Sequence, residues 1–456
     1  MRPWTRITVS YVRRAGSGRV AGAVRRALQD NITKRQHLQV LAAVFLSALA
    51  LSDVQAQAPA PGLTLDVLHW WTSASERRAA DQLAQQLAQA GVLWKDAAIP
   101  GGGGMAAVKV LKSRVLMGDP PDVAQLIGNT LTDWADIGLV LPLGEVAQRQ
   151  RWAQVLFPTV LERVSYKGEV VAAPLGLHRI NTLLFNQRLL AQAGVAPPHS
   201  WAQFEAAVRA VQAQGGRALA WSDEPWQVAT VFEALLLGEA GADLYRELVV
   251  QRRPAAWLDP RVEAALLRLR WLRSLAAEPP RERVWSDNAR ALWQGQAAFL
   301  IMGDWALGEL LAWGAQEGRD FGCAALPGTT GMHLYSMDTL AMLRGPRDRA
   351  SVQETVAEVV VGVGAQLAYN RIKGSVPVRR DIDPAALGPC SRDSWETFAS
   401  ARSQRLPSLA HRMAADETIK DAVAHTLWRY LTQAQTSTQE TQRRLAAVIR
   451  APSAER

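Results

Sequence analysis

Apolar and polar positions alternate along the chain with two different periods. The apolar residues of 63–67 occupy every second position, which predicts a half-buried strand before His69. Leu83 and Leu87 stand one helical turn apart and a glycine follows them, so a helix is predicted for 75–90. Strand and helix patterns continue to alternate after this point. The rhythm predicts an α/β protein with largely parallel sheets covered by helices.

The later segments repeat the pattern and end in helices. Ser200 and Gln203 form a capping-box pattern, which predicts a helix that runs to Gly215. The last hundred residues are expected to be mainly helical, with a polar, frayed tail after Gln433. Further expected elements are a helix from the glycine run to Leu116 and short strands at 122–127, 298–302 and 339–343.

The N-terminal part of the chain has the layout of a secretion signal. An arginine-rich segment precedes an apolar run at 38–51, which is shorter than the roughly 20 residues of a membrane-crossing helix. Small residues follow, and cleavage is expected after Ala56. We interpret this leader as a signal for export to the periplasm. An uncleaved anchor, a buried core helix and an organelle transit peptide are the alternatives.

The net charge belongs almost entirely to the leader. The chain carries 51 basic and 42 acidic side chains, a formal charge of +9, but residues 1–37 alone account for +8. The 400 residues from 57 to 456 sum to only +2. Because so small a charge gives no surface for a polyanion, nucleic acid is not an expected partner.

The usual catalytic signatures are missing from the sequence. It has no GxSxG, no HExxH, no Walker loop and no GxGxxG after a strand. The histidines of the mature chain are not paired at ligand spacing, so neither a metal nor a cofactor is expected. The tetraglycine at 101–104 lacks the Lys-Ser/Thr of a phosphate-binding loop, and it equally lets a backbone approach any polar ligand.

Tryptophans and carboxylates stand where strands are expected to end. Trp70 and Trp71 follow the first strand, Asp304 follows another, and Trp226 lies in a loop after Glu224. Aromatic faces match the C–H faces of a sugar ring, and carboxylates accept hydrogen bonds from its hydroxyls. A lone tryptophan is more often part of a core, and adjacent residues of an extended chain face opposite ways, so at most one of the first pair stacks on a ligand. Glycosidases share this composition, so binding and hydrolysis both stay open.

Eight short motifs occur in a fixed order across residues 62–430. With them the chain resembles the glucose/mannose-type sugar-binding proteins of bacterial ABC importers, within the family 1 extracellular solute-binding proteins. One such motif is weak, whereas eight in order are specific. The motifs are His69-Trp70-Trp71-Thr72-Ser73, the glycines at 101–104 with Val110-Leu111-Lys112-Ser113-Arg114, Gly118-Asp119-Pro120-Pro121-Asp122, Tyr166-Lys167-Gly168, Leu177-His178-Arg179-Ile180-Asn181, Met302-Gly303-Asp304-Trp305-Ala306, Lys373-Gly374-Ser375-Val376-Pro377-Val378-Arg379 and Pro407-Ser408-Leu409-Ala410-His411.

The resemblance implies the type II periplasmic binding protein fold, in which two α/β lobes close about a hinge on a ligand in a central cleft. It also implies a monomer without catalytic activity that captures a monosaccharide, most simply a glucose-like hexose, and delivers it to the membrane permease of an ABC importer. The implied organisation is a leader at 1–56, an N-terminal lobe of 57–174 and 300–345, a C-terminal lobe of 175–299 and 346–435, and a polar tail at 436–456.

By similarity to the family, nine side chains are expected to contact the sugar. Their chemistry suits the role, because carboxylates accept from hydroxyls, lysine donates charge-assisted bonds, glutamine does both, and tryptophan supplies a stacking face. The nine are Trp70, Trp71, Glu76, Gln125, His178, Trp226, Asp304, Lys373 and His411.

One departure from the family pattern bears on the identity of the sugar. Relatives commonly carry Gln-x-His where this chain has Gln125-Leu126-Ile127. Residues two apart in a strand share a face, so Ile127 is expected beside Gln125, toward the cleft. Isoleucine leaves a facing hydroxyl to water or unpaired, at a cost of about 1–3 kcal/mol if that hydroxyl is buried. The resemblance therefore does not fix the sugar as glucose.

A secreted glycoside hydrolase is the alternative function, with Glu76 and Asp304 as the acid and the nucleophile or base. Such a pair needs one raised pKa and carboxyls roughly 5–9.5 Å apart. Lys373 nearby is expected to keep both carboxylates ionised, which favours binding over acid catalysis. A structural or interaction protein is a third class, and it does not account for the polar residues around Asp304.

The chain has two cysteines, and export places them in an oxidising compartment. Cys323 is expected in a strand, and Cys390 in a loop that the resemblance places near the same region. Neither has the Lys, His or CxxC context of a reactive thiol. A structural Cys323–Cys390 disulfide is therefore predicted, and two separate buried cysteines are the alternative.

Overall fold

The computed structural model describes residues 63–101, 104–277 and 284–450. The predicted secretion signal, with its apolar run at 38–51 and its cut after Ala56, lies outside these residues. Within them, no helix combines the length and the apolar character that crossing a membrane requires.

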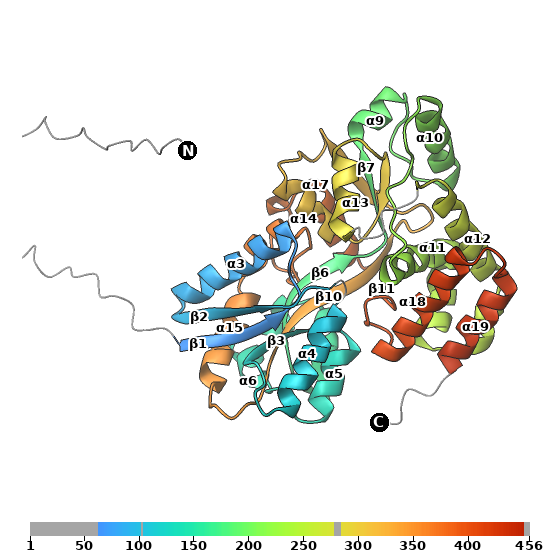
Figure 1. Cartoon of the computed structure of the whole chain (residues 1–456). Helices are drawn as coiled ribbons and strands as arrows, with labels where there is room; N and C mark the ends of the chain where they lie inside the picture. The colour runs from blue at the N-terminus through green and yellow to red at the C-terminus, as the bar shows by residue number, and fades with distance from the viewer. Residues whose placement is uncertain (1–62, 102–103, 278–283, 451–456) are drawn as a thin grey trace, which may run out of the picture. The chain divides into compact units, whose positions relative to one another are not determined.

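The first sheet has the strand order β11-β10-β3-β1-β2, and β6 also pairs with β10 (Figure 1). β1 runs parallel to both β2 and β3, whereas β10 runs antiparallel to β3 and β6. The sheet is thus mixed, with β10 as the strand where the direction reverses. Its strands are β1 (Leu63–His69), β2 (Val92–Ala98), β3 (Val123–Leu126), β6 (Ala173–Arg179), β10 (Met332–Met342) and β11 (Gln404–Pro407).

Helices that alternate with the strands along the chain, as expected, cover the first sheet. α3 packs against β2 and α16, while α15 packs against β6 and β10. The helices of this part are α3 (Ala74–Gln89), α4 (Met105–Leu116), α5 (Asn129–Asp136), α6 (Gly144–Arg149), α7 (Trp152–Val155), α8 (Pro158–Arg163), α15 (Ala350–Val361), α16 (Val363–Lys373) and α17 (Pro389–Ala399), with the short strands β4 (Ser165–Tyr166) and β5 (Glu169–Val170) and the 3₁₀ turn η4 (Pro384–Ala386).

The second sheet is antiparallel. β7 (Thr182–Asn186) is its middle strand, between β8 (Phe299–Ile301) and β9 (Phe321–Ala325), and it runs antiparallel to both. The expectation of largely parallel sheets is therefore wrong for this part. An apolar run predicts a buried strand, but it carries no information about the direction of the neighbouring strand, which arrives here from more than a hundred residues away.

The helices of the second part pack partly on the second sheet and partly on one another. α13 contacts β7 and β8, and α9 contacts β7 and β9, whereas α18 packs against α11 and α19, and α19 packs against α12 and η3, away from the sheet (Figure 1). The predicted capping box is confirmed at α10, where Ser200 and Gln203 bond to each other's backbone N–H groups. These elements are α9 (Gln187–Gln192), α10 (Trp201–Ala213), α11 (Pro225–Tyr245), the π-helix η2 (Arg246–Val250), the 3₁₀ helix η3 (Pro254–Leu258), α12 (Pro260–Ser274), α13 (Trp285–Trp293), α14 (Trp305–Ala312), α18 (Glu417–Thr432) and α19 (Thr438–Arg450).

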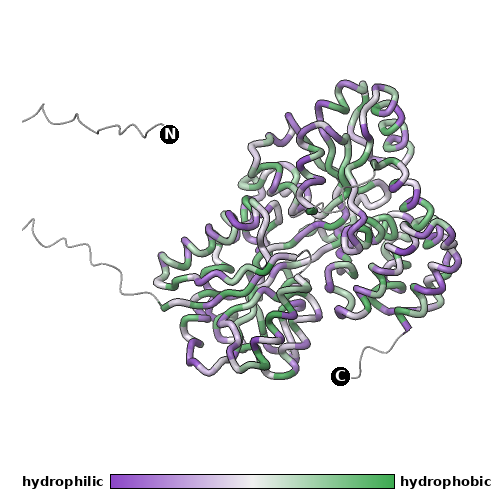
Figure 2. Tube along the Cα trace, viewed as in Figure 1, coloured by the Kyte–Doolittle hydropathy of each residue, from purple (hydrophilic) through white to green (hydrophobic). Residues whose placement is uncertain are grey.

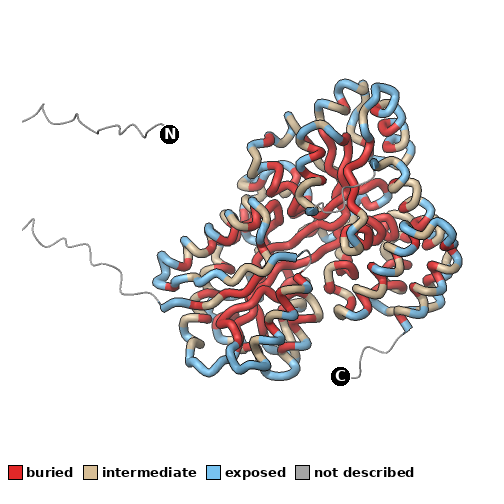
Figure 3. The backbone as a smooth tube through the Cα atoms, viewed as in Figure 1, coloured by how far each residue is buried: buried red, intermediate tan, exposed pale blue. Residues whose placement is uncertain are grey.

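The buried apolar residues form two separate cores, one about each sheet. The first core is built from buried apolar residues within 65–177 and 335–398, together with Met413. The second core is built from buried apolar residues within 180–334 and 406–449, together with Cys390. Figure 2 shows the apolar strands of both sheets, and Figure 3 shows that these strands are buried. The chain passes between the cores near Arg179, near Leu334 and before β11.

This division differs from the predicted lobe limits. β8 and β9 were expected within an N-terminal lobe of 57–174 and 300–345, yet they belong to the second core. α15 and α16 were expected within a C-terminal lobe of 175–299 and 346–435, yet they pack on the first sheet. The physical reason is that a hydrophobic pattern shows which residues are buried, but not which of two cores buries them.

The expected polar tail at 436–456 also needs correction. Residues 438–450 form α19, in which Leu445 and Ile449 lie on one face and are buried in the second core. With Ala446 and Val448, which pack partly buried against the same core, they form an apolar stripe that anchors the helix. The frayed tail that was expected after Gln433 is therefore helical as far as Arg450.

The predicted Cys323–Cys390 disulfide is present. Cys323 lies in β9, as expected, whereas Cys390 lies in the first turn of α17 rather than in a loop. The bond ties the second sheet to a helix whose Trp395 and Phe398 belong to the first core. It therefore connects the two cores through a covalent link.

Candidate ligand-binding site

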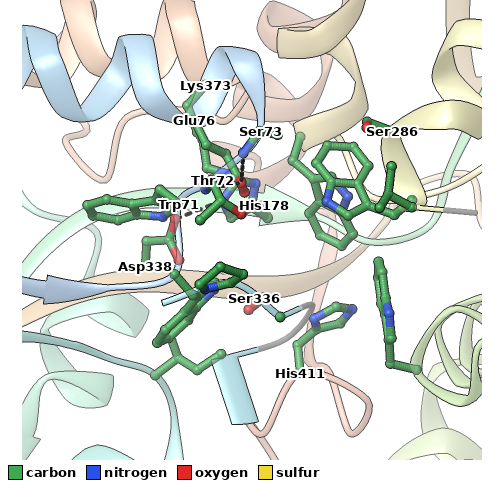
Figure 4. A pocket seen from close by; sticks show the side chains of 18 of the residues that line it. Trp71, Thr72, Ser73, Glu76, His178, Ser286, Ser336, Asp338, Lys373 and His411 are labelled. Atoms are coloured by element: carbon green, nitrogen blue, oxygen red, sulfur yellow. Dashed lines mark hydrogen bonds and ion pairs between the residues drawn. The ribbon is translucent and has the colours of Figure 1, made fainter. Parts of the chain in front are cut away.

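A cavity of about 400 Å³ lies between the two cores, and it is the candidate binding site. Figure 4 shows Glu76, His178 and Lys373 gathered on one side of it, with His411 apart from them. The described residues that line it are Trp70, Trp71, Thr72, Ser73, Glu76, Pro100, Gly101, Ile127, His178, Glu224, Trp226, Val284, Trp285, Ser286, Trp305, Ser336, Asp338, Lys373 and His411.

A buried ion pair joins the start of α3 to the end of α16. Lys373 Nζ lies 2.9 Å from Glu76 Oε1, and the two side chains are 4 % and 11 % exposed. Glu76 Oε2 accepts hydrogen bonds from the backbone N–H groups of Thr72 and Ser73, each at 3.1 Å, as an acidic residue at the third position of a helix does. Burial alone would raise the pKa of Glu76, but Lys373 and hydrogen bonds from Ser73 hold it below its usual value.

Two glycines allow α14 to approach the end of α16. A Cβ on Gly308 would lie 2.6 Å from Lys373 O, and a Cβ on Gly374, where φ is +85°, would lie 2.6 Å from Asp304 O. Only glycine tolerates both the close approach and the left-handed backbone. This packing brings Lys373, at the end of α16 in the first core, next to Asp304, at the start of α14 in the second core.

His178 lies between two carboxylates. Its Nδ1 is 2.6 Å from Asp304 Oδ1, and its Nε2 is 3.2 Å from Asp338 Oδ2. Burial would lower the pKa of His178, but the two carboxylates raise it to about 9. The protonated ring therefore donates from both nitrogens. Burial raises the pKa of Asp304, against the opposing effects of His178 and of the Arg179 N–H, which lies 2.8 Å from Oδ2.

Asp338 accepts hydrogen bonds from three side chains. Gln125 Nε2 lies 3.0 Å from Oδ1, and Tyr369 Oη lies 3.3 Å from Oδ2, beside His178. Burial would raise the pKa of Asp338, but His178 lowers it to about 2. Because a carboxylate has about four acceptor positions, Asp338 can accept a further bond from a ligand. Gln125 Oε1 also accepts a hydrogen bond from the backbone N–H of Trp70, so Gln125 fixes the backbone where the chain leaves β1.

Tryptophan rings supply apolar surface to the cavity. The centroid of Trp305 lies 6.4 Å from that of Trp226 and 5.1 Å from that of His411. Gly303 leaves room for the Trp305 ring, which a Cβ would approach to 2.1 Å, and Gly104 does the same for Trp70 at 2.7 Å. The cavity therefore combines flat apolar faces with charged hydrogen-bonding groups.

His411 reaches the cavity from the loop after β11. Thr230 Oγ1 donates its one proton to Trp226 O at 2.8 Å, so His411 Nε2, 3.1 Å away, donates to Thr230 Oγ1. Its Nδ1 is then an acceptor. Burial and the neighbouring charge of Arg412 lower the pKa of His411 to about 3, so the ring is neutral at physiological pH. A neutral ring of this tautomer suits a hydroxyl donor.

The cavity brings together most of the residues that the sequence predicts. Gln125 and Asp304 are not among its described lining residues; they are 1 % and 2 % exposed and lie behind the wall, bonded to Asp338 and His178. Ile127 lines the cavity, as its strand position predicts. The predicted residues that line the cavity are Trp70, Trp71, Glu76, His178, Trp226, Lys373 and His411.

The sequence patterns do not identify several other lining residues. Trp305 is adjacent to Asp304 in a family motif, but the prediction selected the carboxylate. Asp338 is the one carboxylate in β10, a strand that is buried from its second residue onward, and a carboxylate inside such a run is a signal that could have found it. Trp71 is almost wholly buried, with its ring stacked on His69 at 4.9 Å, so Trp70 is the more exposed member of the pair.

Comparison with known proteins shows the family of the chain. The model of the family described as bacterial extracellular solute-binding protein matches residues 73–345. A probable sugar-binding periplasmic protein of Brucella suis biovar 1 (strain 1330) is 32 % identical over 389 residues, which are 85 % of this chain and 92 % of that protein. A protein of the same description from Rhizobium meliloti (strain 1021) is 33 % identical over 380 residues, 83 % of this chain and 91 % of its own.

Solved structures share the fold at lower identity. The bacterial solute receptor AcbH, described as having an exclusive preference for β-D-galactopyranose, superposes with a TM-score of 0.72 at 19 % identity, over 85 % of this chain and 98 % of its own. A chitin oligosaccharide binding protein gives 0.71 at 18 %, over 86 % and 98 %. The fold is that of the type II periplasmic binding proteins, as predicted. The chain belongs to the bacterial extracellular solute-binding protein family.

Proposed function

We propose that the protein is a periplasmic receptor that binds a sugar and delivers it to the membrane permease of an ABC importer. The observation that carries this proposal is the cavity, which combines tryptophan faces with buried charged hydrogen-bonding groups between two cores. Rings of this kind cover the C–H faces of a sugar, and the charged groups pair with its hydroxyls. The names of the Brucella and Rhizobium relatives support the same class of ligand.

The ligand that suits this cavity is an uncharged monosaccharide, most simply a glucose-like hexose. The volume of about 400 Å³ lies toward the lower end of the roughly 300–1,000 Å³ range of small-molecule sites. Three carboxylates (Glu76, Asp304 and Asp338) face two cations (His178 and Lys373), so the array has an excess of negative charge. An anionic sugar acid would meet net repulsion there. A ligand that contacts both cores stabilises their closed arrangement by its greater affinity for that state.

A glycoside hydrolase that uses Glu76 and Asp304 is the second candidate. Burial raises the pKa of Asp304, as a general acid needs, but both of its oxygens are already engaged, by His178 and by the Arg179 N–H. Lys373 holds the pKa of Glu76 below its usual value, which is the opposite of what a general acid needs. These two observations favour binding without turnover.

A ligand screen of the mature protein tests the proposal. Thermal unfolding followed by titration calorimetry is carried out with hexoses, pentoses, deoxyhexoses and uronic acids, and aryl-glycosides are incubated in parallel. A neutral sugar is expected to raise the melting temperature and to bind with a Kd near micromolar, equivalent to about −8 kcal/mol. Release of the aryl group would instead support the hydrolase, and no stabilisation by any sugar would contradict the proposal.

We further propose export through the N-terminal signal, with cleavage after Ala56, and action as a monomer. Basic residues followed by a short apolar run and small residues support the export step. N-terminal sequencing of periplasmic protein tests the cut, and light scattering after gel filtration tests the monomer. An N-terminus upstream of residue 38 would contradict the signal peptide.

A further inference from the structure

A buried carboxylate outside the cavity holds the loop that carries His411. Glu233 lies on α11 and is 3 % exposed. Its Oε2 accepts the backbone N–H groups of Leu409 at 2.8 Å and Ala410 at 3.2 Å, and its Oε1 accepts the hydroxyl of Ser408. Three consecutive residues of one loop therefore bond to one side chain.

The link continues to His411 itself. The backbone N–H of His411 donates to Ser408 Oγ at 3.0 Å, and that hydroxyl in turn donates to Glu233. On the far side of the loop, Arg412 O accepts the N–H of Asn129 at 3.0 Å. Gly128 makes this contact possible, because a Cβ there would lie 2.1 Å from Arg412 O. The loop is thus fixed between α11 of the second core and the end of β3 in the first sheet.

Burying an ionised carboxylate costs free energy unless hydrogen bonds compensate for the lost water. Burial raises the pKa of Glu233 to about 7, although the loop donors and Tyr245 oppose the shift. Tyr245 Oη lies 3.3 Å from Oε2 and 3.1 Å from Pro407 O, so it also joins Glu233 to the start of the loop. Buried polar networks of this kind fix one backbone arrangement.

We infer that Glu233 is a positioning residue for ligand binding: by holding residues 408–410 it sets the place of the His411 ring in the cavity. The inference rests on the proposed function, since it concerns the same site. Glu233 does not line the cavity, so it acts only through the loop. The neutral Nδ1 acceptor of His411 can meet a ligand hydroxyl only if the backbone of the loop stays in place.

A double-mutant cycle tests the inference. Glu233→Gln keeps the shape of the side chain but replaces one acceptor oxygen with an NH₂ group that faces the Ser408 hydroxyl. The dissociation constant is measured by calorimetry for D-glucose, or for whichever sugar of the screen binds more tightly. Glu233→Gln and His411→Ala are each expected to weaken binding roughly tenfold to a hundredfold, and the double variant no more than His411→Ala alone. The matched control is Glu239→Gln on the same helix, whose carboxylate pairs with Arg268 instead and whose loss is expected to leave affinity unchanged.

Hydrogen exchange gives a second readout that needs no ligand. The amides of Leu409, Ala410 and His411 all bond within this network, so exchange in a peptide covering 405–416 is expected to be faster in Glu233→Gln than in Glu239→Gln. Unchanged exchange there, or additive losses of affinity in the double variant, would overturn the inference. If no sugar binds the wild-type protein, the proposed function fails and the role of Glu233 in sugar binding fails with it; the exchange result then decides only whether Glu233 holds residues 408–410. If Glu233→Gln does not fold, Ser408→Ala breaks the same link and is measured in the same way.

Discussion

Asp304 lies behind His178 rather than in the cavity wall, so its substitution tests the charge balance of the site. Asp304→Asn removes the charge that stabilises the His178 imidazolium while keeping the shape of the side chain. Sugar affinity is expected to fall by about 1.5–3 kcal/mol, the usual worth of a hydrogen bond to a charged group. Calorimetry measures the loss. Asp393→Asn is the control, because that carboxylate pairs with Arg179 but is 62 % exposed; equal affinity in both variants would contradict the assignment.

The raised pKa of His178 predicts a loss of stability in alkaline solution. Below about pH 6.5 the ring is protonated in the folded and the unfolded chain alike, and its stabilising charge is fully present. Between 6.5 and about 9 only the folded chain keeps the proton, so the free energy of unfolding falls as the pH rises. Urea unfolding across this interval is expected to show the decline, with a shallower slope in His178→Gln. Identical slopes would mean that His178 does not hold its proton.

Ile127 offers a test of ligand preference rather than of affinity. It lines the cavity from the residue after β3, two positions from Gln125. Ile127→His places a donor and an acceptor on that wall, so the ranking of hexoses in the calorimetric screen is expected to change in favour of one with a hydroxyl there. Ile127→Val keeps the wall apolar and is expected to keep the original ranking. The same ranking in the histidine variant would show that the ligand does not reach this wall.

Single residues of the site are predictable from the sequence where a motif marks them, and not otherwise. Lys373 lies in a family motif, and Glu76 follows another by three residues. They meet as an ion pair, a contact between residues 297 apart that spacing alone does not reveal. Asp304 lies in a motif too, but the motif does not show that the side chain lies behind the cavity wall. Its place depends on the close packing of α14 against the end of α16. Asp338 has no motif, and its role arises because β10 passes His178 in the folded chain.

At the scale of elements, the packing of α14 against α16 decides where Lys373 lies. Gly308→Ala places a methyl group where the backbone of Lys373 stands, so α16 must shift and the Glu76 pair with it. Both the melting temperature and the sugar affinity are expected to fall, with at least about 1 kcal/mol lost from stability. Gly364→Ala is a matched control on α16, since a Cβ there meets nothing within 4 Å and alanine favours a helix by about 1 kcal/mol. If Gly308→Ala binds sugar like the wild type, the close approach does not position Lys373.

Elements themselves follow closely from local patterns. β1 and α3 begin and end within a residue or two of prediction, because alternation and capping are local properties. α19 is missed because only two of its apolar residues, Leu445 and Ile449, are buried, and they become significant only against a core built elsewhere in the chain. Strand direction in the second sheet is missed for the same reason: pairing between distant segments leaves no local signature.

At the scale of the whole chain, the two-core arrangement is predictable only through the family resemblance. The residues at which the chain passes from one core to the other are not predictable even with it. Both cores are built from discontinuous segments, so the pattern of apolar residues along the chain does not show where one core ends and the other begins. The pairing of the two cysteines was predictable because the resemblance places them in the same region, export implies an oxidising compartment, and the sequence has no other thiol. Their bond joins β9 to α17 and so links the two cores outside the cavity.

This position of the disulfide predicts that it stabilises the scaffold and not the ligand. Cys323 and Cys390 are 67 residues apart, a loop whose closure is worth roughly 4 kcal/mol in the chain-entropy model. A Cys323→Ser/Cys390→Ser double variant is therefore expected to unfold at a lower urea concentration than the wild type, by up to that free energy. Its sugar affinity is expected to stay unchanged, because neither residue is among the described lining of the cavity.

Thiol counting on unfolded, non-reduced periplasmic protein is expected to find no free thiol. Two free thiols per chain would refute the bridge, and a loss of affinity without a loss of stability would show that it acts on the cavity instead.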